Sequence, residues 1–301
     1  MLMRLKLLLS FFAILTAMTA WADVSIDETN FPDEKFRSFV LSQSYGTDGI
    51  LSDEEIAAIT KIDVSDKGIQ SLKGIEYFTS LLELWCFRNQ LTSLDVSQNT
   101  ALVELWCYGN QLTTLDVSQN TALVILVCNV NKLTSLDVSG CTALESLSCY
   151  LNQLTALDLS NNTALKGLDC CGNQLTTLDL SNNTSLVELY CYQNLMTGTG
   201  IDALIACLPS ISSGTIFIIY DEDEHNEMTT TQVTAAKAKG WTPKYFNGHL
   251  WSEYAGSEPS GITSPESSAL CTNTFYNLGG LRTNGLAKGL NIVGGRKVWV
   301  K

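Results

Sequence analysis

The sequence is poor in histidine, in basic residues and in long apolar runs. Its 301 residues include two histidines, His225 and His249. Neither has an evident serine or cysteine nucleophile with an orienting acid nearby, and no phosphate-binding glycine loop precedes a helix, so we expect no enzyme. The 18 Lys and Arg stand against 31 Asp and Glu, for a net charge of −13. Such acidity repels phosphate backbones and anionic lipid, which argues against nucleic acid as a partner.

One apolar run stands at the N-terminus. Arg4 and Lys6 precede the apolar stretch 7–17, and Ala-Trp-Ala at 20–22 supplies a small-x-small cleavage pattern. Residues 1–22 therefore predict a signal peptide. The run is well short of the ~20 residues that a spanning helix needs, and no other segment is long and apolar enough. We expect a protein that is secreted or held at the outer-membrane surface, with no membrane span in the mature chain.

A repeat of 21 residues dominates the remaining sequence. One unit starts at Leu102 and reads LVELWCYGNQLTTLDVSQNTA. The units follow one another over residues 81–198 and resemble the leucine-rich repeat, L-x-x-L-x-L-x-x-N-x-L, with cysteine in the sixth position. Two further residue types recur at fixed positions of the repeat, and we call each such set of equivalent residues a column. The cysteine column is Cys86, Cys107, Cys128, Cys149, Cys170 and Cys191, and the asparagine column is Asn89, Asn110, Asn131, Asn152, Asn173 and Asn194. The resemblance implies a curved solenoid with a parallel β-sheet on its concave face.

Each column has a physical reason. Strands of successive units stack at ~4.8 Å, and alternation sends Leu105 and Cys107 inward and Glu104, Trp106 and Tyr108 outward. The asparagines follow the strand, where their amides can satisfy backbone groups that a tight buried turn leaves unpaired. A second motif, Leu-Asp-Val-Ser or Leu-Asp-Leu-Ser, is too short for a helix and predicts a flat, β-rich convex side, as in internalin repeats. It occupies 94–97, 115–118, 136–139, 157–160 and 178–181.

The exposed ends of such a stack need caps. Residues 23–80 predict a helical N-terminal cap with one helix through Leu41 and a second that starts at Ser52, where Glu55 gives capping-box spacing. The sequence Ile-Asp-Val-Ser at 62–65 resembles the convex motif and would begin the stack.

At the other end, residues 199–254 predict an α/β cap. Its strand–helix–strand order, over 215–246, would continue and close the parallel ladder.

The segment 44–55 has the outline of an EF-hand loop between the two predicted helices of the N-terminal cap. Asp48 falls at loop position five and Glu55 at position twelve, but Ser44 and Gly46 replace the usual acidic ligands. Two interpretations stay open, a weakened calcium site at Asp48 and Glu55 and a metal-free helix–loop–helix cap. No other cofactor is expected.

Residues 255–273 are rich in Ser, Gly, Pro and Thr and predict a linker. Residues 274–301 form a β-tail in which Gly294-Gly295 predicts a hairpin. The tail resembles the end of type IX secretion sorting domains in its Tyr276-Asn277-Leu278-x-Gly280 motif, in Lys288-Gly289-x-x-Ile292 and in its closing Lys-Val-x-Val-Lys. Those domains are usually longer, so a plain β-tail is the alternative.

The ten cysteines suggest disulfides at first sight. However, neighbouring rungs hold Cβ atoms nearly 5 Å apart, whereas a disulfide needs ~3.8 Å. We therefore expect the ladder cysteines to be free, buried thiols that pack as small apolar side chains. A linear column also lacks the tetrahedral convergence of a metal site. Cys141 replaces an asparagine of the repeat, Cys171 lies in an outward concave column, and Cys207 and Cys271 lie outside the repeats.

Large aromatic side chains that point to solvent from the concave face are the main candidates for function. Trp85, Phe87, Trp106 and Tyr108 are predicted to form one contiguous cluster. They are either a stabilising ladder of rings or a binding surface, and Tyr and Trp are typical of binding hot spots. The predicted ligand-binding set is Glu83, Trp85, Phe87, Glu104, Trp106, Tyr108, Tyr150, Tyr190 and Tyr192.

The convex face carries an aspartate column: Asp95, Asp116, Asp137, Asp158 and Asp179. We expect solvated carboxylates bonded to neighbouring hydroxyls, with divalent-cation binding as the alternative.

The repeats resemble those of internalins and of leucine-rich surface antigens from Gram-negative anaerobes. That resemblance implies an extracellular, adhesin-like protein-binding module whose partner lies on a host or neighbouring cell surface. The alternatives are a glycan-binding protein for nutrient capture and an inhibitor or scaffold of a secreted partner.

Overall fold

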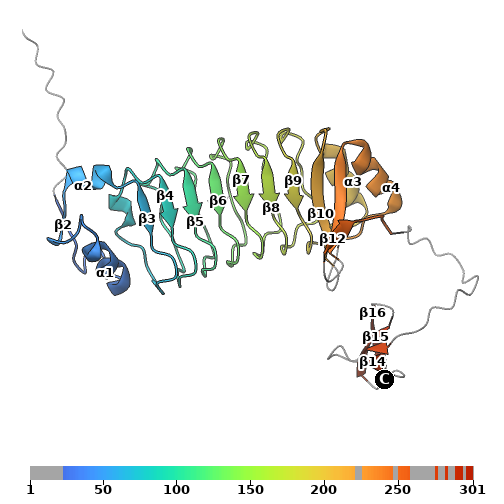
Figure 1. Ribbon diagram of the computed structural model, residues 1–301, viewed down its shortest axis with the longest axis horizontal. Coiled ribbons are helices and arrows are strands. Elements are labelled where there is room, and N and C mark those ends of the chain that lie inside the picture. The colour runs from blue at the N-terminus through green and yellow to red at the C-terminus, as the bar shows by residue number, and fades with distance from the viewer. Residues whose placement is uncertain are drawn as a thin grey trace, which may run out of the picture.

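A ten-stranded sheet runs the length of the solenoid in the computed structural model (Figure 1). The structure describes residues 23–220, 226–246 and 250–257, and beyond them only the backbone of 275–276, 282–283, 289–293 and 296–300. The strand order is β12-β11-β10-β9-β8-β7-β6-β5-β4-β3. Each pair is parallel except β11 and β12, so the predicted parallel solenoid is confirmed.

The repeats contribute six three-residue strands whose central leucines lie in register. Leu105, for example, pairs with Leu84 on one side and with Leu126 on the other. These strands are β4 (Glu83–Trp85), β5 (Glu104–Trp106), β6 (Ile125–Val127), β7 (Ser146–Ser148), β8 (Gly167–Asp169) and β9 (Glu188–Tyr190).

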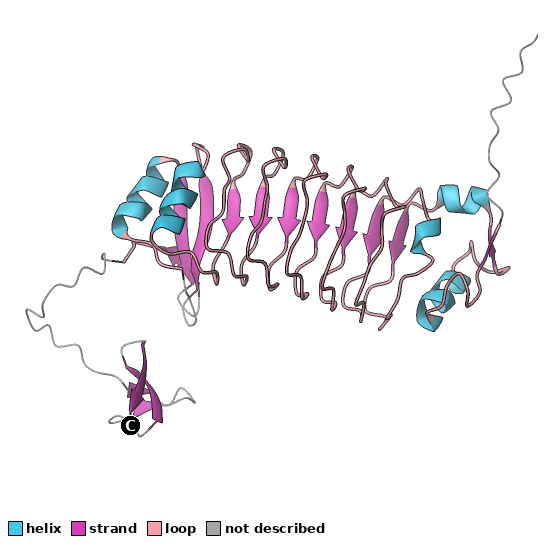
Figure 2. Cartoon of the chain, turned by 180° about the vertical axis from the view of Figure 1, so that it is seen from behind, coloured by secondary structure: helices cyan, strands magenta, loops and turns pink. Residues whose placement is uncertain are grey.

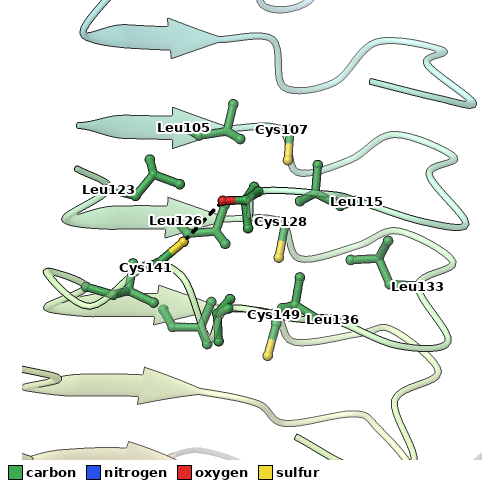
Figure 3. Packing of buried hydrophobic residues seen from close by; sticks show 14 of the residues in the cluster. Leu105, Cys107, Leu115, Leu123, Leu126, Cys128, Leu133, Leu136, Cys141 and Cys149 are labelled. Carbon is green, nitrogen blue, oxygen red and sulfur yellow. Dashed lines mark hydrogen bonds between the residues drawn. The ribbon is translucent and has the colours of Figure 1, made fainter. Parts of the chain in front are cut away.

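Leucine and cysteine columns fill the interior. Figure 3 shows Cys107, Cys128 and Cys149 one above another beside leucines of the same turns. Burial of each leucine stabilises the fold by roughly 1.5–3 kcal/mol relative to an exposed side chain. Each turn of the solenoid gains this stabilisation only when the next turn covers it. No disulfide joins any of the nine described cysteines, and all except Cys207 are buried. Cys271 lies outside the described residues.

The first asparagine column joins each turn to the one before it. The amide of Asn110 donates to the carbonyls of Cys107 at 2.9 Å and Cys86 at 3.0 Å, and its side-chain oxygen accepts the Leu91 N–H at 3.0 Å. Equivalent bonds recur at Asn89, Asn131, Asn152, Asn173 and Asn194. One side chain thus satisfies three backbone groups that the solenoid interior hides from water.

A second asparagine column, whose role the sequence did not predict, lies on the other side of the core. The amide of Asn120 donates to the carbonyls of Val96 and Asn99 at 3.0 and 2.9 Å. Asn99, Asn162 and Asn183 make the same pair of bonds. Cys141 takes the position between Asn120 and Asn162.

The N-terminal cap contains β1 (Val24–Ser25), α1 (Glu34–Ser42), β2 (Ile50–Leu51), α2 (Asp53–Ala58) and the 3-10 turn η1 (Ile75–Tyr77). Asp33 caps α1 by accepting the N–H groups of Lys35 and Phe36. Ser52 and Glu55 form the predicted capping box of α2. β1 and β2 pair antiparallel as a separate small sheet.

The prediction for residues 62–65 is wrong in one respect. They do begin the stack, but β3 (Lys61–Asp63) belongs to the concave sheet, where Ile62 pairs with Leu84. Asp63 does accept the Ser65 N–H, as convex aspartates accept from their own serines. Ile62 precedes Leu84 by about one repeat, and this spacing places the segment on the concave side. The spacing is therefore a better guide to its position than the resemblance of four residues to the convex motif.

The convex side is extended but less regular than a sheet. Its pairing consists of isolated bridges from Asp95 to Asp116 and from Asp116 to Asp137. Leu94 and Val96 point inward, and the aspartates point out, in line with the predicted alternation.

The C-terminal cap is built as the strand–helix–strand order predicts. α3 (Thr199–Cys207) leads into β10 (Gly214–Tyr220), which pairs parallel with β9, and α4 (Thr230–Ala238) crosses to β11 (Trp241–Phe246). The helices α3 and α4 pack together at this end (Figure 2). β12 (Trp251–Glu253) then turns back antiparallel along β11, which the sequence did not predict.

The tail forms its own four-stranded sheet from β13 (Phe275–Tyr276), β14 (Arg282–Thr283), β15 (Gly289–Val293) and β16 (Arg296–Val300). The predicted hairpin is the antiparallel pair of β15 and β16. The side chains of the sorting-signal motif lie outside the described residues, as do the signal peptide at 1–22, His225, His249 and most of the linker. Within the described part, no helix is both long enough and apolar enough to cross a bilayer.

Candidate binding face

The concave face is the surface formed by outward side chains of β3 to β12. In β4 to β9 the central leucine is buried, and its two neighbours reach the surface. The outward positions form rows across the sheet, so Glu83 lies beside Glu104 and Trp85 beside Trp106. The row of Glu83 begins at Lys61 of β3.

Four rings gather at the N-terminal end of this face. The ring centroids of Trp85 and Trp106 are 5.8 Å apart with a 46° tilt, and those of Phe87 and Tyr108 are 4.6 Å apart and nearly parallel at 6°. All four are half-buried. We call these four residues the N-terminal aromatic cluster. The structure thus brings together the residues expected to be contiguous, and their role in binding stays a prediction.

Charged and polar groups surround the two tryptophans. Lys61 Nζ lies 2.6 Å from Glu83 Oε2 and 3.4 Å from the Trp85 ring centroid. The Trp106 indole N–H donates to Glu104 Oε2 at 3.3 Å. The Trp85 indole N–H is buried and has no hydrogen-bond partner among the described residues.

The middle of the face is more closed than predicted. Cys171, expected to point outward, is only 3% exposed. It lies between Tyr150 and Tyr192 of the adjacent turns, and its sulfur is hydrogen-bonded to the Tyr192 hydroxyl. Two large neighbours therefore cover a small side chain. Burial also raises the pKa of Asp169, whose Oδ1 accepts the Cys171 N–H.

A larger aromatic group lies at the C-terminal end of the face. Tyr190 stacks on Phe217 at 4.2 Å and 2°, and Tyr220 stacks on Phe246 at 4.9 Å and 9°. The Trp251 ring lies 4.9 Å from that of Phe217, nearly perpendicular to it. We call the full set the C-terminal aromatic cluster: Tyr190, Tyr192, Phe217, Tyr220, Phe246 and Trp251.

Only Tyr190 and Tyr192 of this cluster were candidates from the sequence. A signal for Phe217 was present, because the Ile-Phe-Ile alternation of β10 buries the isoleucines and turns Phe217 to the opposite face, where it pairs with Tyr190. Trp251 carried no such signal, since β12 runs antiparallel and outside the repeat.

The EF-hand-like loop uses its two candidate ligands for local hydrogen bonds. Asp48 Oδ1 accepts the Ile50 N–H at 3.1 Å, and Glu55 Oε2 accepts the N–H and hydroxyl of Ser52 at 2.9 and 2.8 Å. Nowhere in the described residues do three His, Cys, Asp or Glu gather in an arrangement that could hold a metal ion. Calcium binding at Asp48 and Glu55 stays a prediction.

The convex aspartates each accept the backbone N–H of the serine two residues later, at 2.9 to 3.0 Å. These backbone bonds, together with the serine hydroxyls, lower the pKa of Asp116, Asp158 and Asp179. These aspartates therefore bond to neighbouring hydroxyls, as the sequence predicts.

No family model matches the chain. Internalin J of Listeria monocytogenes serotype 4b (strain F2365) is 42% identical over 72 residues, which are 23% of this chain and 8% of that protein. The solved functional domain of InlJ from Listeria monocytogenes, which includes a cysteine ladder, is 34% identical with a TM-score of 0.60. The match covers 74% of this chain and 47% of that one. An LRR protein of Leptospira interrogans is 29% identical over 52% of this chain and 42% of that chain, with a TM-score of 0.49.

The chain thus spans less than half of the InlJ functional domain and a small part of the curated internalin J. The likeness to InlJ extends over most of this chain and includes its fold, so the chain is an internalin-like leucine-rich-repeat solenoid. The activity and partners of the longer relatives do not transfer with that likeness.

Proposed function

We propose that this chain is a protein-binding module, secreted or exposed at the cell surface, which recognises its partner through the concave face. The observation that carries the proposal is the N-terminal aromatic cluster, in which four large rings stay at the surface of a folded protein beside carboxylates. Aromatic side chains of this kind dominate the energetics of protein interfaces. The extracellular location rests on the signal-peptide pattern at 1–22 and on the likeness to internalin J.

A protein partner is favoured over a glycan by the way the rings are arranged. A sugar stacks on an open ring face, but Phe87 and Tyr108 cover one another at 4.6 Å, as do Tyr190 and Phe217 at 4.2 Å. Such pairs offer mainly ring edges to an approaching molecule. Edges suit the mixed apolar and polar side chains of a protein surface.

Binding is also favoured over thiol chemistry. The thiolate is the reactive form of cysteine, and burial raises the pKa of Cys86 to about 12 and of Cys141 to about 11. These thiols therefore stay protonated at neutral pH and act as packing groups.

The test is capture of purified matrix and cell-surface proteins, and of glycans, by the immobilised full chain. The same panel is run with a Trp106→Ala/Tyr108→Ala variant. Truncation of two interface rings is expected to weaken capture by about 30-fold or more, since hot-spot truncations cost about 2 kcal/mol or more.

Tyr245→Ala is the matched control. Tyr245 is a partly exposed ring of β11 that contacts Tyr254, and strand alternation points it away from the face on which Phe246 lies. Loss of capture by the double variant alone, with circular dichroism unchanged, supports the proposal. Equal capture by all three proteins refutes it, and capture that a soluble oligosaccharide displaces assigns the face to glycans.

A further inference from the structure

A pair consisting of a carboxylate and an aromatic ring recurs on the concave face. Glu83 and Trp85 form it on β4, Glu104 and Trp106 on β5, and Glu188 and Tyr190 on β9. Because the two residues are separated by one buried leucine, strand alternation places both side chains on the same face. The three pairs have different surroundings, and the differences indicate what each can bind.

The first pair already holds a cation of the chain itself. Lys61 reaches from β3 so that its ammonium lies 2.6 Å from Glu83 Oε2 and 3.4 Å from the centre of the Trp85 ring. An ammonium over an indole ring interacts favourably with the ring quadrupole, and the adjacent carboxylate adds an ion pair. The side chains of Lys61 and Glu83 are 45% and 36% exposed, so the cation sits on the solvent side of the face.

The second pair has no such cation beside it among the described residues. On β6 its neighbours in register are Ile125, beside Glu104, and Val127, beside Trp106. Within the described residues Glu104 forms no ion pair, and its carboxylate accepts one hydrogen bond, from the Trp106 indole at 3.3 Å. The second pair therefore has the same residue types at the same strand positions as the first, and no basic side chain of the described residues forms an ion pair with its carboxylate.

In the third pair, both the carboxylate and the ring already have partners within the chain. The Tyr190 hydroxyl donates to Glu188 Oε1 at 2.7 Å, and the Tyr190 ring is stacked on Phe217. It therefore serves as an internal comparison for the second.

We infer that Glu104 and Trp106 receive a lysine or arginine side chain of the protein partner, in the arrangement that Lys61 shows one rung earlier. The inference rests on the proposed function and adds the chemistry of the partner to it. The net charge of −13 supports a basic partner, since it attracts positively charged surfaces over distances longer than a contact. A neutral sugar makes neither the ion pair nor the cation–ring contact.

The probe is a basic peptide, (Lys-Gly)4, titrated into the ¹⁵N-labelled full chain at low salt, with (Gln-Gly)4 as the neutral peptide. The readout is the indole N–H resonance of Trp106, assigned with Trp106→Phe. The basic peptide is expected to shift this resonance, and the neutral peptide is expected to leave it in place. Sodium chloride at a concentration that screens exposed charges should weaken the effect.

Glu104→Gln and Asp116→Asn each remove one carboxylate, the first from the pair and the second from the convex face. Glu104→Gln is expected to weaken peptide binding about threefold, as loss of an exposed ion pair does, and to abolish the Trp106 shift. Asp116→Asn should leave the shift unchanged. Ile125→Lys, which places a lysine next to Glu104 as Lys61 lies next to Glu83, should suppress it.

Binding of (Lys-Gly)4 with no shift at Trp106, or equal effects of Glu104→Gln and Asp116→Asn, overturns the inference. The capture assay separates this failure from failure of the proposed function. If Trp106→Ala/Tyr108→Ala abolishes capture while Glu104→Gln retains it, the concave face binds a protein, and only the basic chemistry of that protein is wrong.

Discussion

The Cys141 thiol (Figure 3) lies 3.6 Å from the carbonyl oxygen of Val117, in the position where neighbouring turns place the amides of Asn120 and Asn162. Its contact with the Asn120 carbonyl is 3.7 Å, compared with 2.9 to 3.1 Å for the asparagine amides of this column. A thiol has one weak donor where an amide has two strong ones. This position therefore tolerates a side chain that is a weak hydrogen-bond donor. We expect that it does not tolerate a side chain that can only accept hydrogen bonds, because the two carbonyl oxygens that face it are acceptors themselves.

Substitutions at Asn162 test this rule. Its amide donates to the carbonyls of Val138 and Cys141 at 2.9 Å each. Asn162→Cys should cost about 1 kcal/mol, the net value of a typical hydrogen bond. Asn162→Asp puts a buried carboxylate against two carbonyl oxygens and should cost about 3 kcal/mol or more. Urea unfolding measures both, and equal midpoints for the two variants would contradict the rule.

The sequence predicted the parts of this molecule that the 21-residue period controls. The inward positions of Leu105 and Cys107 follow from strand alternation alone, and the stack makes them buried. Alternation gives the direction of a side chain but not what covers it, which is why Cys171 was expected at the surface. Trp251 joins the concave face through β12, an antiparallel strand beyond the repeat, and such a pairing has no periodic signal.

Backbone strain predicts a stabilising substitution at Val130. Its φ of 53° is left-handed, a conformation that costs a residue with a Cβ atom roughly 1–2 kcal/mol and is worse for a branched one. The side chain is 41% exposed, so little packing is lost on replacement. Val130→Asn should raise the free energy of unfolding by about 1 kcal/mol, because asparagine tolerates this region.

Val187→Asn is the control for Val130→Asn. Val187 is similarly exposed, but its φ is not positive. The same substitution there should give no gain in the urea midpoint. A gain of equal size at both positions would show that an exposed polar side chain, and not relief of backbone strain, stabilises the protein.

The thiol ladder predicts loss of stability in alkali. Burial raises the pKa of Cys86 from 9.0 to about 12. The stability that comes from keeping this thiol neutral is complete below pH 9 and is lost as pH rises towards 12, because only the unfolded chain releases the proton. Each such thiol should lower the free energy of unfolding by up to about 1.4 kcal/mol per pH unit in this window.

The measurement is urea unfolding from pH 8 to pH 10 under reducing conditions. Cys86→Ala should show a shallower decline than the parent chain. Val96→Ala, which opens a cavity at another fully buried position and keeps every thiol, should decline with the parent slope. Parallel curves for all three proteins would show that Cys86 does not contribute.

Asn226 ends the first asparagine column from outside the repeats, and this predicts a local loss of stability on its removal. Its amide donates to the carbonyls of Cys191 at 2.8 Å and Ile218 at 3.1 Å, and its side-chain oxygen accepts the Met196 N–H at 2.9 Å. Asn226→Ala leaves three buried backbone groups without these bonds, at a cost of about 1–3 kcal/mol for each unsatisfied group. In a solenoid each rung depends on its neighbours, so hydrogen exchange should accelerate in β9 to β11 and stay unchanged in β4 and β5. Uniform acceleration along all strands would mean that the solenoid opens as one unit and that Asn226 has no local role as a cap.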